Sequence, residues 1–203
     1  VSWDNYPLWG NDREKLWETA SYTAFQHDMN RSFLKGKPFM IMESVPSKTN
    51  WHPCCKLKRS GVHLLSSMQA VAHGSDSVQY FQWRKGRGAS AKFRGAVVDH
   101  CGRSDTMEFL GVKSVGDLLK KLPDVAGTST KSQAAVLYDW ENRWAIEDFQ
   151  GTLNRESRRY VETCVEHYRP LWKRGVSTDI VSEDSDFSGY RLLAAPMLYM
   201  LRP

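Results

Sequence analysis

Short apolar runs alternate with longer segments of helical periodicity through residues 1–122, and this alternation constrains the fold more than any other feature. Residues 1–9 have the composition of a strand end followed by a loop. Further strands are predicted over residues 37–43 and 78–83, and helices over residues 12–35, 61–73 and 104–122. A strand–helix order that repeats in this way is typical of βα units around a parallel sheet. The fold class predicted for this segment is therefore α/β.

Residues that favour helix ends bracket the first two predicted helices. Asn11 and Asp12 offer an N-cap to the first helix, and Gly36 offers a stop. The second helix is expected to end at Gly74, because glycine adopts the left-handed conformation that closes many helices.

A break rich in Gly, Ser and Thr over residues 123–132 interrupts the pattern, so a domain boundary is expected there. After it, strands are predicted over residues 134–138, 178–181 and 192–201, with a helix over residues 153–173. This second block is again α/β but stops after three strands. Open doubly wound sheets usually contain more strands, and the chain does not begin with Met. The sequence is therefore expected to be a piece of a longer protein.

A carboxylate closes the strand predicted at residues 37–43. Glu43 follows the apolar run of residues 38–42, and a run of this kind predicts a fully buried strand. Parallel sheets and barrels place their reactive groups at the carboxyl ends of strands, so Glu43 is a candidate for catalysis. Trp51 and His52 follow closely and offer an aromatic platform. The alternative is that Glu43 caps the following turn or pairs with a lysine.

The charge balance raises a different class of function. The net charge is +5, the pI is about 9.0, and part of the excess lies at residues 56–59 and 84–87, near several aromatic side chains. A basic patch interleaved with aromatic residues can bind nucleic acid. No recognised reading motif accompanies the charge, so nucleic-acid binding is a rival hypothesis that we do not adopt.

Neither a membrane segment nor a secretion signal is predicted. No apolar run approaches the roughly 18 residues of a spanning helix, and the N-terminus has no signal-peptide pattern. The four cysteines show no Cys-x-x-Cys spacing and no zinc-site arrangement with histidine. We expect reduced thiols in a cytoplasmic protein, with no metal and no cofactor. These cysteines are Cys54, Cys55, Cys101 and Cys164.

A family resemblance is carried by VSWDNYP at residues 1–7, MESVPS at 42–47, QAVAHGSDSVQYFQWR at 69–84 and YDWEN at 138–142. These segments resemble glycoside hydrolase family 42, the bacterial β-galactosidases, and the resemblance covers nearly the whole chain. It implies a (β/α)8 TIM barrel, of which residues 1–122 are the last third. The start of a flavodoxin-like trimerisation domain then follows over residues 132–203, and the whole protein is expected to be a homotrimer.

The resemblance also implies a reaction, the hydrolysis of terminal β-D-galactosides with retention of configuration. Retention needs two carboxyl groups about 5 Å apart. Glu43 matches the family nucleophile, whereas the acid/base Glu belongs to an earlier strand that lies outside this chain. Trp51 matches a sugar-contacting Trp, and Tyr6 resembles a Tyr that holds the nucleophile. The residues alone leave open that Trp51 is a core side chain and that Tyr6 packs beside Pro7.

Two candidate sugar-binding positions depart from the family pattern, which has a Glu and a His after the Gly-rich loop. Counted from Glu43 without gaps, these positions hold Ala91 and Arg94. Ala91 removes an acceptor, and Arg94 places a fixed cation there. One hypothesis is altered specificity, toward an α-L-arabinopyranoside that lacks the galactose hydroxymethyl group. Another is a non-catalytic sugar-binding or assembly module. The isolated, incomplete barrel is expected to be inactive and to expose apolar strand faces.

Overall fold

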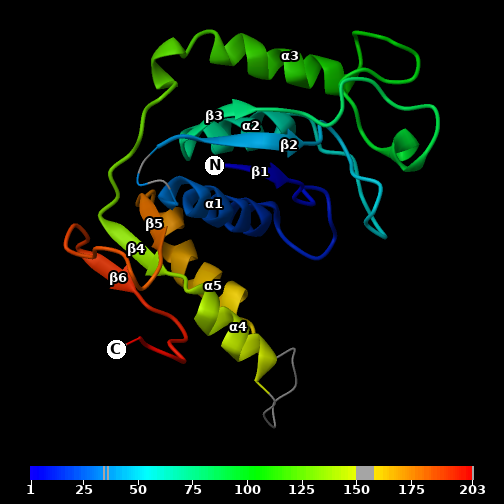
Figure 1. Cartoon of the computed structure of the whole chain (residues 1–203). Coiled ribbons are helices and arrows are strands. Elements are labelled where there is room, and N and C mark those ends of the chain that lie inside the picture. Colours follow the sequence, from blue (N-terminus) through cyan, green and yellow to red (C-terminus); the bar gives the residue numbers. More distant parts are fainter. Residues whose placement is uncertain (34, 36, 150–157, 203) are drawn as a thin grey trace. The chain divides into compact units, whose positions relative to one another are not determined.

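The structure, a computed structural model, describes the chain except for residues 34, 36, 150–157 and 203 (Figure 1). The chain separates into two compact units, Val1–Ser129 and Thr130–Pro203, and each contains its own sheet. Among the described residues, no helix is long and apolar enough to cross a membrane.

Three consecutive strand–helix pairs build the first unit. They are β1 (Ser2–Asn5), α1 (Leu16–Ser32), β2 (Phe39–Ser44), α2 (Val62–Ala72), β3 (Ser75–Val78) and α3 (Met107–Leu119). Two short 3-10 helices, η1 (Ser90–Phe93) and η2 (Pro123–Val125), lie before and after α3 in the chain. The strands pair in the order β1-β2-β3, all parallel, with β2 in the centre (Figure 1). The predicted α/β class with a parallel sheet is confirmed.

Only one face of β2 is buried by the described residues. Phe39 and Ile41 are 0% and 1% exposed and pack against Ala70 of α2, whereas Met40 and Met42 are 38% and 45% exposed. The prediction of a fully buried strand is therefore wrong for this chain. The alternation arises because successive side chains of a strand point to opposite faces, and helices cover one face only.

The helix predicted over residues 12–35 begins later than its N-cap signal suggested. Helix α1 starts at Leu16, with Lys15 as N-cap and the Glu18 carboxylate accepting from the Lys15 N–H. Asn11 instead closes a turn, because its side-chain oxygen accepts from the N–H groups of Arg13 and Glu14. The predicted stop at Gly36 lies outside the described residues. The second helix ends as predicted, with Gly74 at a φ of +102°.

The strand predicted over residues 78–83 is wrong except at its first residue. Strand β3 runs from Ser75 to Val78, where Ser75 pairs with Phe39 and Val78 pairs with Ile41. The aromatic residues that suggested a strand lie just past the sheet. Tyr80 packs against His63 of α2, with ring centroids 5.2 Å apart. Aromatic residues favour strands largely because they pack well against neighbouring side chains. Here those neighbours lie in helices and loops, so the same residues pack without forming a strand.

The second unit contains a smaller parallel sheet. Its elements are β4 (Ala134–Leu137), α4 (Trp140–Asp148), α5 (Tyr160–Lys173), β5 (Thr178–Val181) and β6 (Leu192–Ala194). The strand order is β5-β4-β6, and every residue of the central strand β4 is buried. The prediction of α/β structure here is confirmed. The helix predicted over residues 153–173 is observed from Tyr160, and its residues 153–157 lie outside the described part.

Two predictions in this unit need correction. Sequence reasoning missed α4, which Asp139 caps by accepting a hydrogen bond from the Asn142 N–H. The strand predicted over residues 192–201 ends at Ala194, since Pro196 has no N–H to donate and Met197 has a φ of +51°. The segment after β6 is held by buried Asn142 instead. Its side-chain oxygen accepts from the N–H groups of residues 199 and 200, and its amide donates to the Met200 carbonyl.

Candidate active site

A shift in strand register determines which face of the sheet carries Glu43. Trp3 pairs with Ile41 but Asp4 pairs with Glu43, so β2 contains one extra residue, Met42, at this point. Simple alternation would have turned Glu43 toward the helices, together with Ile41. The extra residue turns it to the opposite face, as β-bulges commonly do beside active sites.

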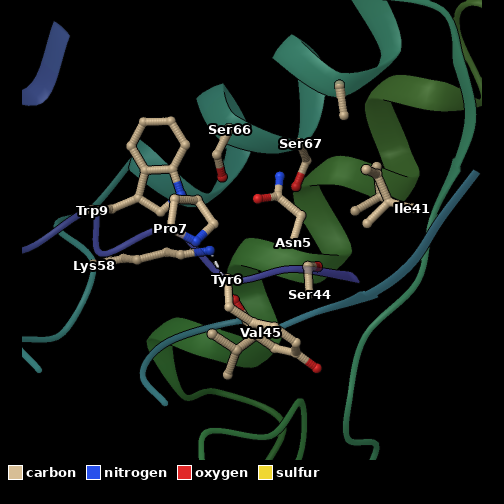
Figure 2. A pocket seen from close by; sticks show the side chains of 12 residues that line it. Asn5, Tyr6, Pro7, Trp9, Ile41, Ser44, Val45, Lys58, Ser66 and Ser67 are labelled. Atoms are coloured by element: carbon tan, nitrogen blue, oxygen red, sulfur yellow. Dashed lines mark hydrogen bonds between the residues drawn. The ribbon is translucent and has the colours of Figure 1, made fainter. Parts of the chain in front are cut away.

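A small cavity on the helix side supports this assignment. It has a volume of about 20 Å³, and residues from β1, β2 and α2 line it, among them Asn5, Ile41, Ser44 and Ser67 (Figure 2). Glu43 is not among its lining residues. Ser44 therefore faces the helices, and Glu43, its neighbour in the chain, faces the open side of the sheet.

Tyr6 follows β1 and holds the Glu43 carboxylate. Its phenol hydroxyl donates a hydrogen bond to Oε2 of Glu43. Burial, together with this hydrogen bond, raises the pKa of Tyr6 above its ordinary value, so the phenol remains a donor at any physiological pH. The alternative, that Tyr6 merely packs beside Pro7, does not account for the hydrogen bond between Tyr6 and Glu43.

Arg94 is the second partner of Glu43. Its Nη2 lies 3.6 Å from Oε2 of Glu43, and its side chain is 12% exposed. The guanidinium carbon lies 4.4 Å from the ring centroid of Tyr6, 4.6 Å from that of Trp51 and 4.2 Å from that of Phe81. We call Tyr6, Trp51 and Phe81 the aromatic box. A cation over aromatic faces at these distances is favourable, because each ring face is electron-rich.

The box brings together residues from three separate loops. The rings of Tyr6 and Trp51 meet edge to face, with centroids 5.0 Å apart and an interplanar angle of 84°. Trp51 is 50% exposed, so the alternative of a core tryptophan is wrong. The sequence places Phe81 in a predicted strand and among the aromatic residues near the basic patch, but not in the catalytic site. The run Tyr80-Phe81-Gln82-Trp83 was the available signal, since so many aromatic residues directly after a short strand are unusual.

Ala91 contributes main-chain atoms only. It lies in η1, where its carbonyl accepts from the Gln82 side-chain amide at 3.3 Å and from the Arg94 N–H at 3.1 Å. The structure thus gathers Glu43, Tyr6, Trp51 and Arg94 into one site and places Ala91 in the turn that leads to Arg94. Glu43 pairs with Tyr6 and Arg94, not with a lysine as the alternative suggested.

Two of the basic side chains, Lys56 and Lys58, have partners within the fold. Lys58 is 8% exposed, and its ammonium group donates to the Val45 carbonyl at 2.8 Å. Burial lowers the pKa of Lys58 to about 8. Lys56 pairs with Asp12. The predicted absence of nucleic-acid binding stays a prediction, but Lys56 and Lys58 of the cluster at residues 56–59 have partners within the fold.

The described residues show no metal centre. No group of three or more His, Cys, Asp or Glu side chains within them could hold an ion. All four cysteines are free thiols, and Cys164 is buried.

A carboxylate near the carboxyl end of a parallel strand, beside an exposed tryptophan and a tyrosine donor, lies where α/β barrels place their reactive groups. The family models agree. The model described as beta-galactosidase, of glycoside hydrolase family 42, matches residues 1–122, and the model described as beta-galactosidase trimerisation domain matches residues 132–203. The chain belongs to glycoside hydrolase family 42, and its first unit is a segment of a TIM barrel.

Individual relatives are similar over the whole chain. The β-galactosidase Pbg of Clostridium perfringens is 58% identical over 203 residues, which are 100% of this chain and 29% of the relative. The β-galactosidase from Rahnella sp. R3 has a solved structure with a TM-score of 0.95 and 50% identity, covering 99% of this chain and 29% of that one. Gan42B, described as a GH42 β-galactosidase, gives a TM-score of 0.94 at 52% identity, covering 98% and 29%. The chain therefore spans less than a third of the length of these relatives.

Proposed function

We propose that this chain carries the nucleophile of a retaining glycoside hydrolase that cleaves terminal β-D-galactosides. The position of Glu43 is the observation that carries the proposal. Glu43 is the last residue but one of the parallel strand β2, faces away from the helices, and contacts a hydrogen-bond donor and a cation. A hydrogen-bond donor and a nearby cation both favour the ionised form of a carboxylate, which is the form that acts as a nucleophile. The names of the relatives, all β-galactosidases, support galactosides as the substrate class.

The proposed reaction has two displacements. An oxygen of Glu43 attacks the anomeric carbon, while the bond from that carbon to the aglycone oxygen breaks and its electron pair leaves with the oxygen. A carboxylic acid from a part of the enzyme outside this chain protonates the leaving oxygen. Water then attacks the anomeric carbon and gives a proton to the same carboxyl group, and Glu43 departs as a carboxylate.

The neighbours of Glu43 receive supporting roles in this proposal. Tyr6 fixes the orientation of the carboxylate through its hydrogen bond. Trp51 presents a half-exposed indole to the apolar face of the sugar. Arg94 touches both the carboxylate and the box, so it borders the place where the sugar ring would lie.

The domain assignment belongs to the same proposal. Residues 1–122 form the last third of the barrel, and residues 132–203 form the start of a flavodoxin-like trimerisation domain in a cytoplasmic homotrimer. The three-stranded parallel sheet of the second unit and the family model for trimerisation support this assignment. The four free thiols are consistent with a reducing compartment.

An α-L-arabinopyranosidase activity is the second candidate. The guanidinium of Arg94 reaches into the aromatic box, and a sugar that lacks the hydroxymethyl group needs less room there. The double substitution Ala91→Glu with Arg94→His restores the family pattern and should raise kcat/KM for β-galactosides. An unchanged galactoside kcat/KM would contradict altered specificity at these positions.

Covalent trapping tests the proposed function. We would use a chimera in which this chain replaces the matching 203 residues of the Clostridium perfringens relative, so that the barrel is complete. An activated 2-deoxy-2-fluoro-β-galactoside should label Glu43, as mass spectrometry of the peptides would show. The Glu43→Gln chimera should take up no label and is the control. A folded chimera that takes up no label on Glu43 and hydrolyses no glycoside would favour a non-catalytic sugar-binding or assembly module.

A further inference from the structure

Arg94 is a buried cation with hydrogen-bonding capacity that the chain does not use. Its Nε and Nη2 atoms are buried and have no hydrogen-bond partner among the described residues. The ion pair with Glu43, at 3.6 Å, is longer than a hydrogen bond. The aromatic box around the guanidinium offers ring faces but few acceptors. A buried guanidinium with unpaired N–H groups is costly, so acceptors from a ligand, or from a part of the enzyme outside this chain, would be favourable there.

The proposed reaction changes the charge balance around Arg94. In the resting site the charges of Glu43 and Arg94 offset each other. When Glu43 becomes an ester of the sugar, its negative charge disappears and the guanidinium loses the counter-charge that this chain supplies. The transition state itself carries positive charge on the sugar ring. A fixed cation beside that ring therefore opposes the reaction of a neutral sugar.

A substrate with its own negative charge removes this conflict. A carboxylate matches the planar fork of a guanidinium and forms short, charge-assisted hydrogen bonds with it. It would pair with Arg94 in both displacements and would also offset the charge of the sugar ring. The turn before Arg94 offers no competing acid, because Ala91 carries only a methyl group and the next residue is Lys92.

We propose that the sugar bound beside Glu43 carries a carboxylate in place of the hydroxymethyl group, as in a β-D-galactopyranosiduronic acid. Arg94 is the residue that determines this specificity. The proposal rests on the proposed function, because it requires Glu43 to act as nucleophile on a galactose-like ring.

The test compares three substrates on the chimera. They are the 4-nitrophenyl derivatives of β-D-galactopyranosiduronic acid, β-D-galactopyranose and α-L-arabinopyranose. We expect kcat/KM for the uronide to exceed that for the galactoside by about ten- to a hundredfold, the worth of one charged hydrogen-bonding partner. The unaltered Clostridium perfringens enzyme should prefer the galactoside. A galactoside or arabinopyranoside preference in the chimera would overturn the proposal.

Substitutions assign the preference to Arg94. Arg94→His should lower the uronide-to-galactoside ratio by about tenfold or more. Arg94→Lys keeps the positive charge but lacks the planar fork of N–H donors, so it should lower the ratio less. This variant keeps the test decisive if the His variant does not fold. Lys92→Ala is the matched control, because Lys92 lies over Phe93, outside the box, and its loss should leave the ratio unchanged. Equal ratios in the Arg94 variants and the parent would overturn the assignment.

Trapping separates failure of this inference from failure of the proposed function. Label on Glu43 together with a galactoside preference refutes the acidic sugar alone. No label and no turnover of any of the three glycosides refutes both.

Discussion

Replacing Tyr6 by Phe is expected to slow glycoside hydrolysis by the chimera without unfolding it. The substitution keeps the ring, its edge-to-face contact with Trp51 at 5.0 Å and its contact with Arg94. It removes only the hydroxyl that donates to Oε2 of Glu43. A hydrogen bond to a charged group is worth about 1.5–3 kcal/mol, so kcat/KM should fall about 10- to 150-fold. Because Tyr6 holds the nucleophile, the loss should appear mainly in kcat.

The assay measures initial rates with whichever 4-nitrophenyl glycoside the chimera hydrolyses fastest, and a melting curve confirms that each variant is folded. Tyr80→Phe is the matched control. The Tyr80 hydroxyl lies 3.4 Å from Ser67 Oγ on the helix side of the sheet, so its removal should leave kcat/KM near the parent value. A folded Tyr6→Phe variant that is as active as Tyr80→Phe would refute the idea that Tyr6 orients Glu43.

The remaining predictions concern the sugar platform and stability. Trp51→Ala should lower kcat/KM about three- to tenfold through lost stacking, whereas Trp83→Ala, at a 66% exposed position, should have no effect in the same assay. Burial lowers the pKa of His27 well below its ordinary value and that of His63 to about 3, so the folded state binds fewer protons than the unfolded state below about pH 6.5. The free energy of unfolding should therefore fall by about 1.4 kcal/mol per histidine for each pH unit below that value, as urea titrations at pH 7 and pH 5 would show. His63→Phe should make this pH dependence shallower, and an unchanged slope would contradict the assignment. Asn142→Ala should cost about 2–4 kcal/mol, measured by urea unfolding, because it releases the chain at residues 199 and 200.

Local pattern was sufficient for the order and type of most elements. The apolar run before Glu43 and the helical spacing after Gly61 are properties of neighbouring residues, and short-range sterics and hydrophobic burial act on them directly. The strand-end position of Glu43 followed for the same reason, and so did the parallel order of the first sheet. The motifs around Glu43 also carried the family, since a motif is itself a local pattern.

Contacts between distant segments decided the rest. The face on which Glu43 lies depends on one extra residue in β2 relative to β1, and register is a relation between two strands that neither strand encodes alone. The aromatic box joins Tyr6, Trp51 and Phe81 around Arg94, and no spacing in the sequence relates these loops. The sequence by itself determined that a carboxylate would stand at a strand end. Only the tertiary structure decided that this carboxylate would face a buried arginine whose Nε and Nη2 have no hydrogen-bond partner among the described residues, because burial and pairing depend on which surfaces the folded chain brings together.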